Sequence, residues 1–166
     1  MKKNLINEVS RIQQIMGKSI ISEQAAALKV LKNIFTDFSD DAFRVVWRVG
    51  LDHLWFRDPR ATEYIKKLSF LSDEWKANGK IFSTYKHDGT KVTDYESLSM
   101  YGGTLPFFVM MEPGIANDIY YTKLASQYDQ DLEEFKEDIG YYASNWVWFG
   151  IAFYEGKLLN LEDIDQ

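Results

Sequence analysis

The chain has 166 residues, a formal net charge of −6 and no cysteine. Its length suits one domain with a substantial core, and its acidic balance argues against nucleic acid as a partner, because a phosphate backbone needs a basic protein face. The lack of cysteine excludes disulfides, thiolate nucleophiles and zinc knuckles, and the two histidines, His53 and His87, are too few and too isolated for most metal sites. We therefore expect no metal and no other cofactor.

Aromatic residues make up 16% of the chain, which is the unusual feature of the composition. Such a density indicates either a heavily packed core or a surface on which flat ligands stack. Helical spacing assigns several of them to the core: Phe43, Trp47, Trp55, Tyr64, Trp75, Phe107, Phe108 and Phe135. Two groups are the candidates for stacking: three tyrosines on an expected hairpin and loop, Tyr85, Tyr95 and Tyr101, and the dense cluster of Tyr141, Tyr142, Trp146 and Trp148.

Residues 1–23 carry an apolar stripe at helical spacing, formed by Leu5, Val9, Ile12 and Met16. One interpretation is a docking or capping helix. The other is a detachable leader, because the segment resembles the leaders of large marine tailed-phage proteins, and Ile21-Ser22-Glu23 fits their cleavage motif. The apolar run of a signal peptide is missing, and no stretch approaches the roughly 18 apolar residues that span a bilayer, so no membrane segment is expected and the localisation stays open.

Helical periodicity predicts helices over residues 24–38, 41–56, 58–78, 113–127 and 131–155. The last of these is either one helix or two segments divided at Gly140. Asp58-Pro59 begins the third of these and Asn78-Gly79 ends it. Asp88-Gly89 lies between two apolar segments and predicts a β hairpin over residues 81–95, whereas Gly102-Gly103 predicts a loop. The expected fold is mainly α with one small β hairpin, in a helical domain over residues 24–160 that precedes an acidic tail, residues 161–166.

The predicted helix over residues 41–56 is apolar on nearly all sides, which is typical of a buried helix. Yet Asp41, Arg44, Arg48 and Asp52 fall at spacings of three and four and share one face. Buried charges require partners or water. The stripe is therefore either an internal ladder of ion pairs, Asp41–Arg44 and Arg48–Asp52, or the lining of a polar cleft in which Arg44 orients Asp41.

The run Asp40-Asp41-Ala42-Phe43-Arg44-Val45-Val46-Trp47-Arg48 resembles glycoside hydrolase family 8, which carries a Tyr-Asp-Ala-x-Arg-x-Pro-Trp-Arg segment. The resemblance continues through Leu54-Trp55-Phe56-Arg57-Asp58 and the Tyr85-Lys86-His87-Asp88-Gly89 segment. It ends with Tyr141-Tyr142 and Asn145-Trp146-Val147-Trp148-Phe149-Gly150, and so covers roughly residues 25–160. The first of these motifs is the most specific.

The resemblance implies part of an (α/α)6 barrel and the inverting hydrolysis of a β-1,4-linked glycan. By resemblance, Asp41 matches the general base and Arg44 the arginine beside it. These residue types suit the reaction, because an adjacent guanidinium favours the ionised carboxylate that activates water. The residues that the resemblance places at the substrate are Asp40, Arg48, Tyr85, Tyr141 and Tyr142.

The chain departs from the family in length, since it matches only the C-terminal half of the barrel. An inverting glycosidase needs two carboxyl groups about 6.5–9.5 Å apart, and no general acid is recognisable before Asp41. Glu112, which precedes Pro113, is the best internal substitute by sequence context. Its alternative role is that of an acidic residue at the start of a helix, favoured by the helix dipole.

Three hypotheses follow from these observations. The chain is a shortened glycosidase with Asp41 as base, or a non-catalytic glycan-binding or structural protein that retains half a barrel. In the second case an exposed apolar edge predicts a homo-oligomer or a partner chain that covers it. The third hypothesis is a protein packaged in a phage virion, with residues 1–23 as its leader.

Overall fold

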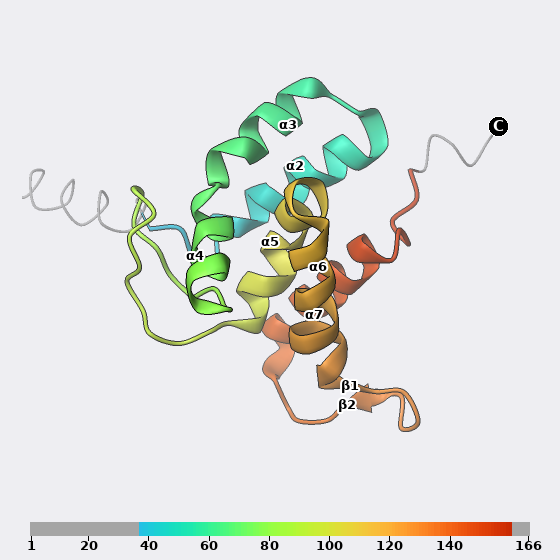
Figure 1. Ribbon diagram of the computed structural model, residues 1–166. Helices are drawn as coiled ribbons and strands as arrows, with labels where there is room; N and C mark the ends of the chain where they lie inside the picture. Colours follow the sequence, from blue (N-terminus) through green and yellow to red (C-terminus); the bar gives the residue numbers. More distant parts are fainter. Residues whose placement is uncertain (1–36, 161–166) are drawn as a thin grey trace, which may run out of the picture. The chain divides into compact units, whose positions relative to one another are not determined.

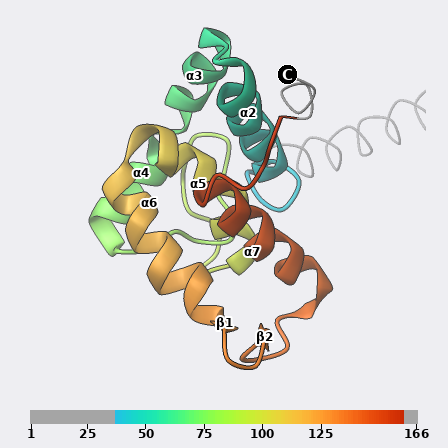
Figure 2. The same ribbon diagram turned by 90° about the vertical axis from the view of Figure 1, so that its right-hand side faces the viewer.

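The computed structural model describes residues 37–160, and the predicted leader, most of the first predicted helix and the acidic tail lie outside them. The prediction of a mainly helical fold is confirmed (Figure 1). The α-helices of the described residues are α2 (Phe43–Phe56), α3 (Pro59–Ile65), α4 (Phe70–Asn78), α5 (Leu98–Met111), α6 (Pro113–Ile119) and α7 (Gly140–Tyr154). Figures 1 and 2 show α5 in the middle, with α2, α6 and α7 packed around it.

Helix α5 is the centre of the core, and each residue from 99 to 108 is buried. The predicted loop at Gly102-Gly103 is therefore wrong. A Cβ on Gly102 would lie 2.0 Å from the carbonyl oxygen of Trp146 in α7, and one on Gly103 would lie 2.0 Å from the ring of Phe43 in α2. The two glycines lie in a helix, where their lack of a side chain lets neighbouring elements approach the backbone. A Gly-Gly pair is more often the mark of a turn, which is why the sequence pattern predicted a loop.

The predicted helix over residues 58–78 has the expected ends but is not continuous. Asp58 caps α3 by accepting a hydrogen bond from the Arg60 amide, with Pro59 at the first helical position. A 3-10 turn, Lys66–Leu68, then separates α3 from α4. Helix α4 ends at Gly79 in the left-handed conformation, with φ of 64°, as its glycine predicts.

The predicted hairpin over residues 81–95 forms no regular strand. Tyr85 makes isolated bridges to Phe38 and to Lys91, and the Asp88 carboxylate accepts a hydrogen bond from the Thr90 amide in the intervening turn. The segments on either side of Asp88-Gly89 therefore do approach each other, but as a loop.

The hairpin of the structure lies instead at β1 (Tyr128–Asp129) and β2 (Glu134–Phe135), which pair antiparallel. The expected break at Gly140 is present, because α7 begins there, but residues 131–139 are not helical as predicted. The carboxylate of Asp129 accepts hydrogen bonds from the amides of Asp131 and Leu132. Such local bonds stabilise a turn in competition with a helix.

The predicted helix over residues 113–127 is present as three consecutive helical segments. Helix α6 is followed by a π-helical turn, Tyr120–Leu124, and by a 3-10 turn, Ala125–Gln127. The β1–β2 hairpin then leads from this segment to α7 (Figure 2).

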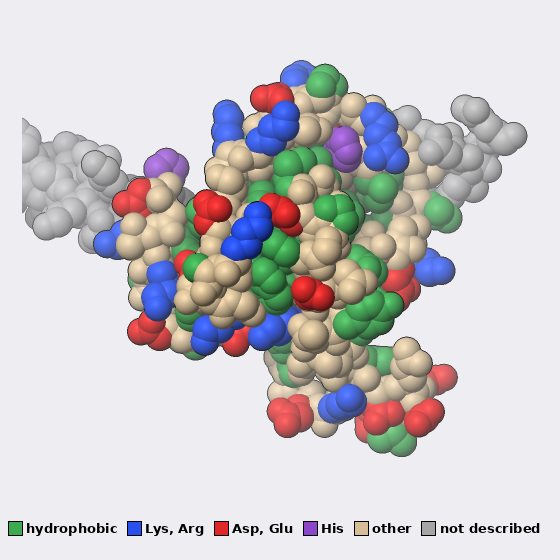
Figure 3. Space-filling model, viewed as in Figure 1, with side chains coloured by type: hydrophobic (Ala, Val, Ile, Leu, Met, Phe, Trp, Pro, Cys, Tyr) green, Lys and Arg blue, Asp and Glu red, His purple; other side chains and the backbone are tan. Residues whose placement is uncertain are grey.

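Negative charge gathers around the β1–β2 hairpin at the bottom of Figure 3. The acidic residues of this stretch are Asp129, Asp131, Glu133, Glu134, Glu137 and Asp138, and Lys136 is its one basic residue. The net charge of −6 is therefore unevenly distributed along the chain. Among the helices of residues 37–160, none combines the length and the apolar character that crossing a bilayer requires.

Candidate functional site

A cleft of about 380 Å³ lies between α2 and α7. Its lining comes from three residues of α2 and five of α7: Arg44, Trp47, Arg48, Tyr141, Tyr142, Asn145, Trp146 and Phe149. Four residues assigned to the substrate or the catalytic centre from the sequence, Arg44, Arg48, Tyr141 and Tyr142, are thus brought together from distant parts of the chain. Asp40 and Asp41 lie immediately before α2, at one end of this cleft.

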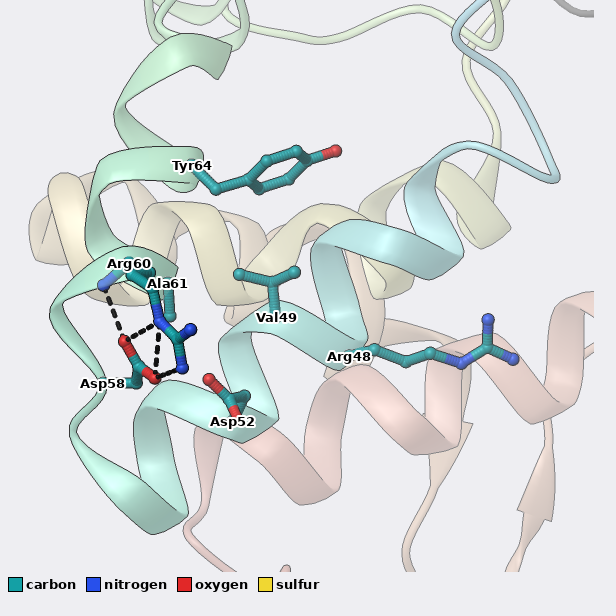
Figure 4. Close-up of a pocket in the computed structure, with 7 residues that line it drawn as sticks. All are labelled: Arg48, Val49, Asp52, Asp58, Arg60, Ala61 and Tyr64. Carbon is teal, nitrogen blue, oxygen red and sulfur yellow. Dashed lines mark hydrogen bonds and ion pairs between the residues drawn. The ribbon is translucent and has the colours of Figure 1, made fainter.

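The charged stripe of α2 forms only one of the two expected ion pairs. Arg44 lies 3.2 Å from Asp41, whose side chain is 92% exposed. The side chain of Arg48 makes no ion pair and no hydrogen bond with any residue in the described range 37–160, and Figure 4 shows it extended away from Asp52. The stripe therefore lines a polar cleft rather than forming a complete ladder.

The hydroxyl group of Tyr142 fixes the end of the cleft at which Asp40 and Asp41 lie. It donates a hydrogen bond to the carbonyl oxygen of Asp40 at 3.0 Å and accepts one from a terminal nitrogen of Arg44 at 3.2 Å. The hydrogen bond to Tyr142, followed by the negative charges of Asp41 and Asp40, raises the pKa of Arg44. A guanidinium so held stays cationic and in one position beside the Asp41 carboxylate.

The aromatic side chains of α7 occupy different depths of the cleft. Trp146 is 9% exposed and packs edge-on against Phe43, so it forms the floor. Tyr141 is 88% exposed, and its hydroxyl group has no hydrogen-bond partner within residues 37–160. It offers a ring at the mouth of the cleft that a flat ligand could cover.

Three lining residues were not singled out from the sequence as contacts: Trp47, Asn145 and Phe149. Trp47 was assigned to the core, and its indole N–H donates to the carbonyl oxygen of Phe149 at 3.4 Å. The signal that could have found the other two is spacing, because Tyr141, Asn145 and Phe149 follow one another at intervals of four and share one face of α7.

Tyr85 is not part of the cleft, and its assignment as a glycan contact is not compatible with its place in the core. None of its side chain is exposed, and its hydroxyl oxygen accepts a hydrogen bond from the Phe82 amide at 2.6 Å. Burial raises the pKa of Tyr85 to about 12. Tyr85 lies in the core because the segment around it bridges to Phe38 and Lys91 instead of forming an exposed hairpin.

Glu112 lies between α5 and α6, in a pocket separate from the cleft. Its carboxylate accepts hydrogen bonds from the ammonium group of Lys76 at 2.6 Å and from the hydroxyl group of Ser72 at 2.7 Å. The contact with Lys76, and then that with Ser72, lowers the pKa of Glu112. A general acid needs the opposite shift, so Glu112 has the environment of a structural carboxylate.

A second cleft, of about 350 Å³, lies between α2 and α3 (Figure 4). Its lining residues are Arg48, Val49, Asp52, Asp58, Arg60, Ala61 and Tyr64. Hydrogen bonds from the Arg60 side chain and amide lower the pKa of Asp58 to about 2, so this carboxyl group is ionised at neutral pH. Arg48 lines both clefts, which therefore adjoin along α2.

The rings and guanidinium groups of the α2–α7 cleft can recognise a ligand, and the exposed carboxylates of Asp40 and Asp41 lie at one end of it. No aspartate or glutamate is among its lining residues. Within the described residues, no group of three or more histidine, aspartate or glutamate side chains is placed to hold a metal ion.

Comparisons with protein families, with curated proteins and with solved structures found no match to the chain. The functional assignment therefore depends on the residues of the cleft and on their geometry.

Proposed function

We propose that the chain binds a β-1,4-linked glycan in the cleft between α2 and α7, as a non-catalytic protein related to half of a glycosidase barrel. The observation that carries this proposal is the meeting of Arg44, Arg48, Tyr141 and Tyr142 in one cleft. These are residues that the resemblance to glycoside hydrolase family 8 assigns to the catalytic centre or the substrate. An aromatic face beside hydrogen-bond donors suits the alternating C–H and O–H surface of a sugar.

The absence of a second suitable carboxyl group favours binding over catalysis. Among residues 37–160, the exposed carboxylates beside the cleft are Asp40 and Asp41, which are neighbours in the chain and lie at the same end of it. Glu112 and Asp58 are both held in the ionised form by basic partners. Inverting hydrolysis needs a protonated partner across the scissile bond. None of the lining residues supplies one.

Binding is tested by isothermal titration calorimetry of the full chain with hexamers of β-1,4-linked glucose, xylose and glucosamine. Tyr141→Ala should weaken binding of the preferred hexamer by about tenfold, because it removes the most exposed ring of the cleft. Tyr95→Ala is the matched control, since Tyr95 is 64% exposed and lies outside the cleft. Binding of no hexamer, or equal losses in the two variants, would contradict the proposal.

Hydrolysis by this chain is the second candidate function, and the Asp41–Arg44 pair at 3.2 Å is the observation that favours it. Its general acid would have to come from outside the described residues. Release of reducing ends that is lost in Asp41→Asn but kept in Glu112→Gln would establish it. Binding without release of reducing ends in the wild type would leave the non-catalytic proposal standing.

We also propose that the chain associates with itself or with a partner chain, and that it comes from a phage virion. Large apolar side chains that are at least 41% exposed include Val45, Phe56 and Trp148. They support a homo-oligomer, or a partner chain that covers the open side of a half-barrel. Sedimentation velocity showing only a monomer would contradict self-association.

The proposal of a phage leader is tested separately. The intact mass of virion-extracted protein would show whether the mature chain starts at Gln24, as such a leader requires.

A further inference from the structure

The charge of the α2–α7 cleft differs in sign from that of the whole chain. Two arginines and no carboxylate line the cleft, although the chain carries a net charge of −6. Asp41 lies 3.2 Å from Arg44 and compensates that guanidinium. Asp40, at the same end of the cleft, also acts on Arg44. The side chain of Arg48, by contrast, forms no ion pair with any of residues 37–160.

The N–H donors of the Arg48 guanidinium group can bond only to a ligand or to water, because no described residue accepts from them. It lies one helical turn after Arg44 on the same face of α2, and its side chain has no ion pair or hydrogen bond within residues 37–160. Asp52, one turn further on, does not approach it within ion-pair distance, and Figure 4 shows the guanidinium group reaching away from that carboxylate. A guanidinium group presents its donors as a planar fork that matches a carboxylate.

The surroundings of Arg48 favour a sugar acid over other anions. The cleft also contains the exposed ring of Tyr141, against which a pyranose ring can pack while a carboxylate on that ring reaches the guanidinium group. A nucleic acid would meet only two arginines here, with the acidic hairpin elsewhere on the same body. A sugar that carries one carboxylate needs one such contact.

We propose that the cleft selects glycans that contain uronic acid residues, and that Arg48 binds their carboxylate groups. This inference rests on the proposed glycan-binding function and specifies its ligand class. The Asp41–Arg44 pair marks the end of the cleft where a neutral part of the glycan lies, because the exposed carboxylate of Asp41 repels an acidic sugar.

The test compares two probes with the same backbone, the hexamer of β-1,4-linked glucose and the hexamer of β-1,4-linked glucuronic acid. Calorimetry of the full wild-type chain should give at least about tenfold tighter binding of the acidic hexamer, with an affinity that falls as salt is added. Arg48→Gln should reduce the affinity for the acidic hexamer about tenfold more than the affinity for the neutral one. Arg48→Lys should recover part of this preference, because it keeps the charge but not the fork.

Lys86→Gln is the control for net charge, since Lys86 is exposed and lies outside the cleft. Equal affinities for the two hexamers, or equal losses of both in Arg48→Gln, would overturn the inference while leaving the proposed glycan binding intact. Failure to bind any of the neutral or acidic hexamers, in a chain whose circular dichroism shows it to be folded, would overturn both.

Discussion

The hydroxyl oxygen of Tyr142 lies 3.2 Å from a guanidinium nitrogen of Arg44 and so joins the first turn of α7 to the first turn of α2. The guanidinium group also lies above the Tyr142 ring, 5.6 Å from its centroid. The same hydroxyl group donates a second hydrogen bond to the carbonyl oxygen of Asp40. Tyr142 therefore holds the backbone segment that carries Asp41. The candidate carboxylate is therefore positioned by a tyrosine of another helix.

Replacing this hydroxyl group tests whether it organises the cleft. Tyr142→Phe removes both bonds but keeps the ring, so we expect glycan affinity to fall by about tenfold and the melting temperature to fall by a few degrees. Tyr141→Phe is the matched control, because the Tyr141 hydroxyl group has no partner in residues 37–160. Calorimetry and thermal unfolding measure the two effects. Identical behaviour of the two variants would show that the hydroxyl group of Tyr142 is dispensable.

The close contact between α5 and α7 predicts that adding one methyl group at Gly102 has a large effect on the free energy of unfolding. Gly102→Ala should lower the free energy of unfolding by at least about 2 kcal/mol, because its Cβ would lie 2.0 Å from the carbonyl oxygen of Trp146. Gly114→Ala, with open space around its Cβ, should instead raise it by about 0.4–1 kcal/mol. Urea denaturation of both variants provides the measurement. Wild-type stability of Gly102→Ala would mean that the two helices lie further apart than described.

The ion pair between Asp58 and Arg60 predicts how stability changes with pH. The pKa of Asp58 is lowered from 3.8 to about 2 in the folded chain, so the carboxylate stabilises the fold above about pH 4 and loses this effect as the pH falls towards 2. Asp58→Asn keeps a cap for α3 but not the charge. It should therefore be less stable than the wild type near neutral pH, with a difference that disappears on acidification.

Urea denaturation at a series of pH values measures this difference. Asp118→Asn is the control, because Asp118 is exposed and makes no ion pair among the described residues. A deficit of Asp58→Asn that stays constant down to pH 2 would show that the charge of Asp58 does not contribute to stability.

The fold was predictable from the sequence where local chemistry decides it. Asp58, Pro59 and Gly79 have roles that depend on their own backbone and nearest neighbours, and the structure places all three at helix ends as expected. Gly102 and Tyr85 were assigned wrongly, because their surroundings are made by residues distant in sequence. Gly102 accommodates the backbone of α7, and Tyr85 is enclosed by its bridges to the chain on both sides.

The candidate site was predictable in its residue types and less so in its arrangement. Helical spacing placed Arg44 and Arg48 on one face of α2, and the structure shows that face lining a cleft. The spacing predicted an Arg48–Asp52 pair equally well, and it does not form. Side chains four residues apart are within reach of each other, but their rotamers depend on what lies opposite, here α7. No pattern within residues 41–56 contains that information.

The glycine contacts around α5 also determine the size of the opening between α2 and α7. Phe43 of α2 lies against Gly103, and Gly150 of α7 lies against Gly102, so that a Cβ on Gly150 would come within 2.8 Å of the Gly102 Cα. The two helices that form the walls of the cleft, α2 and α7, therefore both pack on the same stretch of α5, behind the lining residues. The spacing of the two walls therefore depends on glycines that do not line the cleft, so an exchange at Gly102, Gly103 or Gly150 would disturb the site without changing any side chain that lines it.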